Sequence, residues 1–262
     1  MTDFSELPLV FFTTLSQMAV GAFVVLYLLR KNDHIQEMAA DRIAVIVVVL
    51  MALAMGGAST HLGDPVGGWR ALLGLEHSWL SREIFVMSGF LGLAFLYALP
   101  QLKSFRSLAG LLGVVFGVVG IVVTAMVYTL PARPAWNSPY PLLFFALTAL
   151  SAGPLLVSYI VHEQEGTICQ AALKLTSFAL IAGFIVSVLY ASQQSANLAM
   201  PAGWLALRCL IGQLLPAALL YKLTQQPAGR NLLMILVLVV LGELLGRQLF
   251  YGSVLAYPLF PF

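Results

Sequence analysis

Residues 43–58 read IAVIVVVLMALAMGGA, and the next residues, Ser59-Thr60-His61-Leu62-Gly63-Asp64-Pro65, end that apolar run with a histidine, an aspartate and a proline. An apolar run of this length is typical of a membrane-spanning helix, and an ionisable side chain is costly at membrane depth. Such a side chain is a functional candidate, and imidazole is the group that titrates closest to neutral pH. His61 is therefore a candidate for proton exchange at the edge of a bilayer.

The composition of the whole chain supports a membrane protein. Of its 262 residues, 60% are hydrophobic and only 9% are charged, whereas a soluble domain has about 25% charged residues. The net charge of +2 is small and dispersed, which does not favour nucleic-acid binding. The N-terminal residues MTDFSE are acidic, so we expect no cleaved signal peptide and a retained first span.

Eight segments have the roughly 20 mainly apolar residues that a spanning helix needs. They are residues 7–29, 42–62, 83–102, 107–130, 141–161, 171–193, 203–223 and 230–252. The gaps between them are too short for an independent soluble domain. The sequence therefore predicts an all-α integral membrane protein with eight transmembrane helices, in a single membrane domain, 1–262.

The distribution of basic residues predicts the orientation of these spans. One side would collect eight of them: Arg30, Lys31, Arg42, Lys103, Arg106, Lys174, Lys222 and Arg230. The other would collect five: Arg70, Arg82, Arg133, Arg208 and Arg247. Because cytoplasmic loops carry the excess of lysine and arginine, we expect the first group to be cytoplasmic. Both termini, the 63–82 loop and His61 would then lie outside.

The two halves of the chain share a weak motif. PLVFF at 8–12 opens the first span, and PLLFF at 141–145 opens the fifth. This similarity predicts two parallel four-helix halves, 1–133 and 134–262, related by an axis along the membrane normal. His61 would then correspond to Gln194, so that only the first half keeps the histidine. The alternative is a chance match, since PLxFF is common in apolar sequence.

Glu83 lies at the expected start of the third span, directly after Ser81 and Arg82. One interpretation is structural: Ser81 caps the helix and the carboxylate complements its dipole. The other is functional: the carboxylate faces the same membrane boundary as His61 and accepts a proton or orients the histidine. The sequence leaves both open.

Other charged residues lie within or beside the apolar segments. Glu243 and Arg247 are four residues apart, so they share a helix face and can pair. One interpretation is a structural ion pair. Another is that Arg247 lines a polar cavity or contacts a partner while Glu243 holds it, and both can be true. Arg208 is expected to extend toward the membrane surface, as is Arg70 beside Trp69. Asp64 and Arg70 could pair and order the loop between them.

The ligand residues do not favour a bound metal centre. Cys169 and Cys209 lie far apart, whereas iron–sulfur and structural zinc sites need about four clustered ligands. We therefore expect no iron–sulfur cluster in this protein. No predicted span carries two histidines, so we also expect no haem. Aromatic residues are expected at the outer interface, where they anchor membrane proteins: Trp79, Trp136, Trp204 and Tyr251.

Four segments together resemble the membrane anchor subunit of dimethyl sulfoxide reductase and related molybdoenzymes. They are ELPLVFFT at 6–13, HLGDP at 61–65 with WRAL at 69–72, LSREI at 80–84, and GELLGR at 242–247 with FYG at 250–252. The resemblance extends over essentially the whole chain. The order and spacing of the segments make it fairly specific, although each segment alone would be weak.

The resemblance implies a bacterial inner-membrane subunit without haem. Such a subunit binds menaquinol at a periplasmic site and passes its electrons to an iron–sulfur subunit, which feeds a molybdopterin catalytic subunit. The resemblance also associates His61 and Glu83 with quinol oxidation. Asp64, Arg70, Glu243 and Arg247 are candidates for residues that shape or support the quinol site.

Two other functions remain open from the sequence. Parallel halves and embedded charges suit a transporter or channel, although charges near the middle of the spans are few. The protein could also be a purely structural anchor whose charges only hold a partner.

Overall fold

The computed structural model describes residues 6–60, 66–131, 133, 136–165, 169–194, 202–225 and 231–255. In these residues the regular elements are helices, and eight segments are long and apolar enough to cross a membrane. Six are single helices: α1 (Leu7–Lys31), α2 (Glu37–Ser59), α3 (Trp79–Ala98), α5 (Tyr140–Glu165), α6 (Gln170–Gln194) and α9 (Leu232–Leu255). The predicted all-α fold with eight spans is confirmed.

Two spans are built from more than one helical element. The 3₁₀ helix η3 (Pro100–Phe105) leads directly into α4 (Arg106–Tyr128). The seventh span joins α7 (Ala202–Leu207), the π-helix η4 (Arg208–Leu214) and α8 (Leu215–Gln225). A short 3₁₀ helix, η2 (Val66–Gly74), lies between α2 and α3.

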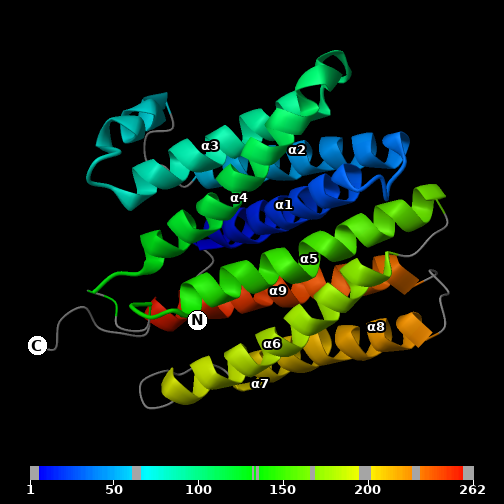
Figure 1. Ribbon diagram of the computed structural model, residues 1–262. Coiled ribbons are helices and arrows are strands. Elements are labelled where there is room, and N and C mark those ends of the chain that lie inside the picture. The colour runs from blue at the N-terminus through cyan, green and yellow to red at the C-terminus, as the bar shows by residue number, and fades with distance from the viewer. Residues whose placement is uncertain are drawn as a thin grey trace, which may run out of the picture.

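Helices α1 and α5 lie side by side at the centre of the molecule, with α2, α3 and α4 on one side and α6, α7 and α8 on the other (Figure 1). Helix α9 lies beside α5 and also contacts α1, and α4 likewise contacts α5. The first helix of each predicted half packs against the second: α1 packs against α2, and α5 packs against α6. The predicted duplication of the chain stays a prediction.

The central crossing of α1 and α5 depends on two glycines. A Cβ atom on Gly21 would overlap the carbonyl oxygen of Ala149, and one on Gly153 would overlap the backbone of Gly21 and Ala22. Small residues let helix backbones approach closely in a membrane, where dispersion and packing replace the hydrophobic drive between helices. The two halves of the bundle therefore meet through backbone contact at these glycines.

The outer surface is apolar, as a lipid-facing surface must be. Exposed stripes at helical spacing run along α2, through Val45, Val49 and Leu53, and along α4, through Leu111 and Val115. Because lipid covers these side chains, this surface does not need charged residues to interact with water. This explains how a sequence that is 60% hydrophobic forms a single bundle.

The π-helix has an identifiable cause in the sequence. Pro216 has no backbone N–H, and a proline ring clashes with the carbonyl four residues earlier in an α-helix, here that of Gly212. A wider π turn relieves that clash, and such turns are frequent at functional sites. Gly212 also lies against α9, since a Cβ atom on it would be 2.5 Å from the Cα atom of Gly242. This close crossing positions Arg208, the first residue of the π-helix, beside α9.

The two ends of the bundle carry different residues. Helix α2 ends and α3 begins at one end, here called the Glu83 end; α3 ends and α4 begins at the other, here called the Arg106 end. The distribution of basic residues predicts that the Arg106 end faces the cytoplasm.

Replacing Gly21 by alanine tests the central crossing. The added methyl group has no space against the α5 backbone, so we expect a loss of about 1–3 kcal/mol from overpacking and a lower thermal midpoint in detergent. Gly56→Ala is the matched control, because a Cβ atom there meets nothing within 4 Å; a helical glycine-to-alanine change should be neutral or stabilising by up to about 1 kcal/mol. Equal effects of the two changes would contradict the close crossing.

Candidate functional site

The start of α3 determines where Glu83 lies. The helix begins at Trp79, and the Ser78 hydroxyl oxygen accepts a hydrogen bond of 3.3 Å from the backbone N–H of Ser81. The prediction that Ser81 caps this helix is therefore wrong: Ser78 is the cap, and Ser81 is buried in the first turn. Four residues of α3 thus precede Glu83.

Arg82 fastens this helix start to the preceding loop. Its Nε donates a hydrogen bond of 2.9 Å to the carbonyl of Leu75, and its Nη2 donates one of 2.7 Å to the carbonyl of Glu76. The guanidinium also lies 4.4 Å from the ring centroid of Trp79, a cation–π distance. The start of α3 is therefore held in place without any contribution from Glu83.

Glu83 is a buried carboxyl group within the span. Its residue is 4% exposed, and its Oε1 atom has no hydrogen-bond partner among the described residues. Thr124 of α4 is the polar neighbour of this carboxyl group. The helix dipole acts on the first turn, and that turn of α3 carries no acidic residue. The structural interpretation of Glu83 therefore does not account for the cost of burying it.

Two buried tyrosines extend this polar region toward α9. The rings of Tyr128 and Tyr251 are 5.4 Å apart, and the Tyr251 hydroxyl lies 3.5 Å from that of Thr13. Both phenols lie within electrostatic reach of Glu83 and Arg247. Tyr251 is only 2% exposed, so the prediction that it lies in an interfacial belt is wrong. Trp79 and Trp204 are exposed, and their place at the outer interface stays a prediction.

Arg247 of α9 joins three helices. It is 2% exposed, and its Nη2 donates hydrogen bonds to the side-chain oxygen of Gln17 on α1, to the Thr148 hydroxyl at 2.8 Å and to the Phe144 carbonyl at 3.2 Å. The guanidinium also lies 4.2 Å from the ring centroid of Phe145. Hydrogen bonds to a charged group are the stronger kind, so Arg247 is a main polar link between the two halves.

Thr148 connects Glu243 to Arg247. The Thr148 hydroxyl lies 2.5 Å from the Glu243 Oε2 atom, to which it can donate, while it accepts from Arg247. The two charged residues share a helix face, as predicted, and the hydrogen-bonded connection between them runs through α5.

Arg208 adds a second buried guanidinium to this group. It is 6% exposed, its guanidinium lies 5.0 Å from the ring centroid of Phe144, and its charge interacts with that of Glu243. A Cβ atom on Gly246 would overlap the guanidinium, so the glycine provides its space. The prediction that Arg208 extends to the membrane surface is wrong, because the π-helix turns it inward.

The remaining predicted residues lie elsewhere or outside the described residues. Arg70 is exposed on η2, with its guanidinium 5.9 Å from the ring centroid of Trp69, as an interfacial arginine should be. His61 and Asp64 lie outside the described residues, so their roles and the pairing of Asp64 with Arg70 stay predictions. In the sequence His61 directly follows Thr60, the C-cap of α2.

The structure thus brings Glu83 and Arg247 into one polar region, through residues that the sequence reasoning missed. The sequence pattern does not single out Tyr128 or Thr148, because tyrosine and threonine are common in apolar segments. Gln17, an amide within the first span, and Tyr251, four residues after Arg247 on the same helix face, were detectable. The arrangement places a buried carboxyl group, which can exchange a proton, in the same polar region as two tyrosine hydroxyls and the Arg247 hydrogen bonds.

A double-mutant cycle tests the charge network. Arg247→Met removes the hydrogen bonds to Gln17, Thr148 and Phe144 and leaves their buried acceptors without this donor, so we expect a loss of roughly 1–3 kcal/mol or more. In a Glu243→Gln background the same change should cost less, with a coupling of about 0.5–3 kcal/mol. The thermal midpoints of the four proteins in detergent measure this. Strictly additive effects would mean that the two residues are not coupled.

The sequence is similar to known proteins over nearly its whole length. Residues 1–253 match the model of the family described as DMSO reductase anchor subunit (DmsC). Two relatives from Escherichia coli, the anaerobic dimethyl sulfoxide reductase chain YnfH and a second anaerobic dimethyl sulfoxide reductase chain, are each 30% identical, with 94% of both sequences covered. A sulfite dehydrogenase subunit of Allochromatium vinosum is 26% identical over 131 residues, which are 44% of this protein and 40% of that relative. Given the family match over nearly its whole length, the chain belongs to the family of DMSO reductase anchor subunits.

Proposed function

We propose that this protein is the quinol-oxidising membrane subunit of an anaerobic respiratory molybdoenzyme complex in the bacterial inner membrane. It binds menaquinol at the Glu83 end and passes electrons to an iron–sulfur subunit, which supplies a molybdopterin catalytic subunit. The single observation that carries the proposal is the buried Glu83 carboxyl group, whose Oε1 atom has no hydrogen-bond partner among the described residues. The names of the relatives, chains of dimethyl sulfoxide reductases, support the kind of complex.

The chemistry of quinol oxidation explains why a buried carboxyl group is needed. Oxidation of menaquinol to menaquinone releases two electrons and two protons, and a general base must lie within hydrogen-bond reach of a quinol hydroxyl. Glu83 supplies one such group from α3. His61, next to the end of α2 in the sequence, supplies the second, and α2 packs against α3. Each group accepts one proton, and both protons leave toward the outer side.

The surrounding residues position the groups that exchange protons and do not themselves accept protons from the quinol. The Tyr128 and Tyr251 hydroxyls offer hydrogen bonds beside Glu83, and Arg247 fixes the helix that carries Tyr251. Asp64 and Arg70 order the loop over the site. Because the protein is expected to hold no haem or iron–sulfur cluster, both electrons leave to a cluster of the partner subunit above the Glu83 end.

Replacing Glu83 by glutamine tests the role of the carboxyl group. The amide keeps the shape but cannot accept the proton, so quinol-driven turnover of the whole complex should fall about 10²-fold or more, the usual contribution of a general base. Turnover with an artificial donor that reduces the soluble subunits directly should not change. Glu76→Gln is the control, since that nearby carboxylate is 89% exposed.

Replacing His61 by alanine should have the same selective effect. Measured in the same membranes, quinol-driven turnover should be lost while artificial-donor turnover persists, because His61 would take up the second proton. If quinol-driven turnover persisted in both variants, the result would contradict the proposal and favour a purely structural anchor.

A further inference from the structure

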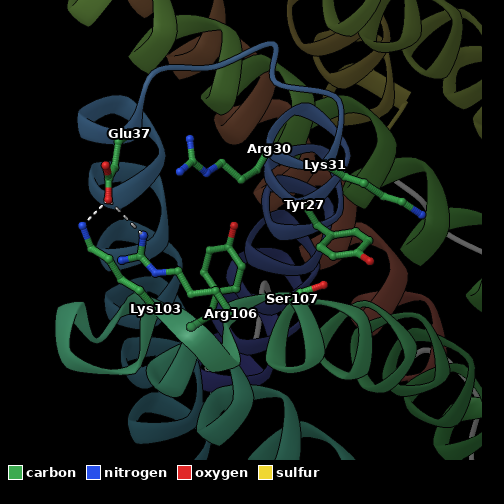
Figure 2. A pocket seen from close by; sticks show the side chains of 8 residues that line it. Tyr27, Arg30, Lys31, Glu37, Lys103, Arg106 and Ser107 are labelled. Carbon is green, nitrogen blue, oxygen red and sulfur yellow. Dashed lines mark hydrogen bonds and ion pairs between the residues drawn. The ribbon is translucent and has the colours of Figure 1, made fainter.

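A cavity of about 370 Å³ opens at the Arg106 end, opposite the proposed quinol site (Figure 2). The end of α1, the start of α2, the end of α3 and the start of α4 surround it. Four basic side chains line it: Arg30, Lys31, Lys103 and Arg106. Glu37 is the carboxylate in the lining, and Tyr27 and Tyr97 supply aromatic rings. The cavity is therefore strongly cationic.

Two carboxylates offset only part of this charge. Glu37 is paired with Lys103 and lies 3.9 Å from the Arg106 guanidinium, contacts that Figure 2 marks. Asp41, one helical turn further along α2, lies 2.8 Å from Arg106. Arg30 and Lys31 have no ion pair within the described part of the chain, and Arg30 acts on Glu37 only at longer range. A surplus of positive charge thus remains beside the opening.

Arg106 has hydrogen-bonding capacity that the protein does not use. Its side chain is only 11% exposed, and its buried Nε–H has no hydrogen-bond partner among the described residues. The guanidinium lies 5.8 Å from the ring centroid of Tyr97. The Arg106 guanidinium adds positive charge to the wall of the cavity.

The aromatic wall of the cavity is shaped by a glycine. A Cβ atom on Gly110 would lie 2.6 Å from the Tyr27 ring and 3.1 Å from the Tyr97 ring, so both rings rest against the backbone of α4. Next to the lining residues in the sequence, Leu28, Phe105 and Leu108 are exposed apolar side chains. The cavity thus combines cations, phenol hydroxyls and an adjoining apolar surface.

We propose that this cavity binds the phosphate headgroup of an anionic phospholipid from the leaflet at the Arg106 end. Arg30 and Lys31 hold the phosphate, with the Arg106 charge behind them, and the exposed apolar residues contact the acyl chains. Basic pockets between helices on the cytoplasmic side attract anionic headgroups, with about 1 kcal/mol per basic residue. The proposal does not depend on quinol oxidation at the other end.

Native mass spectrometry of the purified protein, with phosphatidylglycerol or phosphatidylcholine added in detergent, tests this site. We expect tighter binding of phosphatidylglycerol, and Arg30→Gln should weaken it about fivefold, as the loss of one basic residue implies. Phosphatidylcholine binding should not change. Arg42→Gln is the matched control, because Arg42 is an exposed arginine on the same end that does not line the cavity. Unchanged thermal midpoints show that both variants are folded.

Three outcomes would overturn the proposal. Equal weakening by Arg30→Gln and Arg42→Gln would mean that only general surface charge attracts the lipid. An unchanged affinity in Arg30→Gln would remove the cavity from lipid binding. Displacement of phosphatidylglycerol by equimolar inorganic phosphate would mean that the cavity recognises free phosphate and not a lipid.

Discussion

The hydrogen bonds of Arg247 are the interaction on which the rest of the bundle depends. Lipid offers no partners to a buried guanidinium, so the protein must supply them. Gln17 of α1 and Thr148 of α5 do so, and Thr148 passes the contact on to Glu243. Because α1 and α5 belong to different halves, this one side chain holds the halves in a fixed relation where the polar residues gather.

Backbone packing and the polar network complement each other along the central helices. The crossing at Gly21 and Gly153 brings α1 and α5 close enough for Arg247 to contact both. The hydrogen bonds of this network do not involve Glu83, which lies on α3. For this reason the proposed function assigns proton exchange to the Glu83 carboxyl group.

The sequence predicted the class of fold well because membrane spanning imposes a strong compositional rule, which residues 43–58 illustrate. It predicted Glu83, Glu243 and Arg247 as special because charges in apolar segments are visible by contrast. It failed where local backbone geometry decides the outcome. Starting α3 four residues earlier moved Glu83 into the span, and the π-helix before Pro216 turned Arg208 inward. Tyr128 escaped notice because its role comes only from its neighbours in space.

Binding of a non-oxidisable quinol analogue to the purified protein tests the central claim most directly. We predict saturable binding with one site per molecule, strongly weakened by Glu83→Gln and unchanged by Glu76→Gln, in protein with an unaltered thermal midpoint. Absence of saturable binding, or equal affinity in all three proteins, would contradict the account.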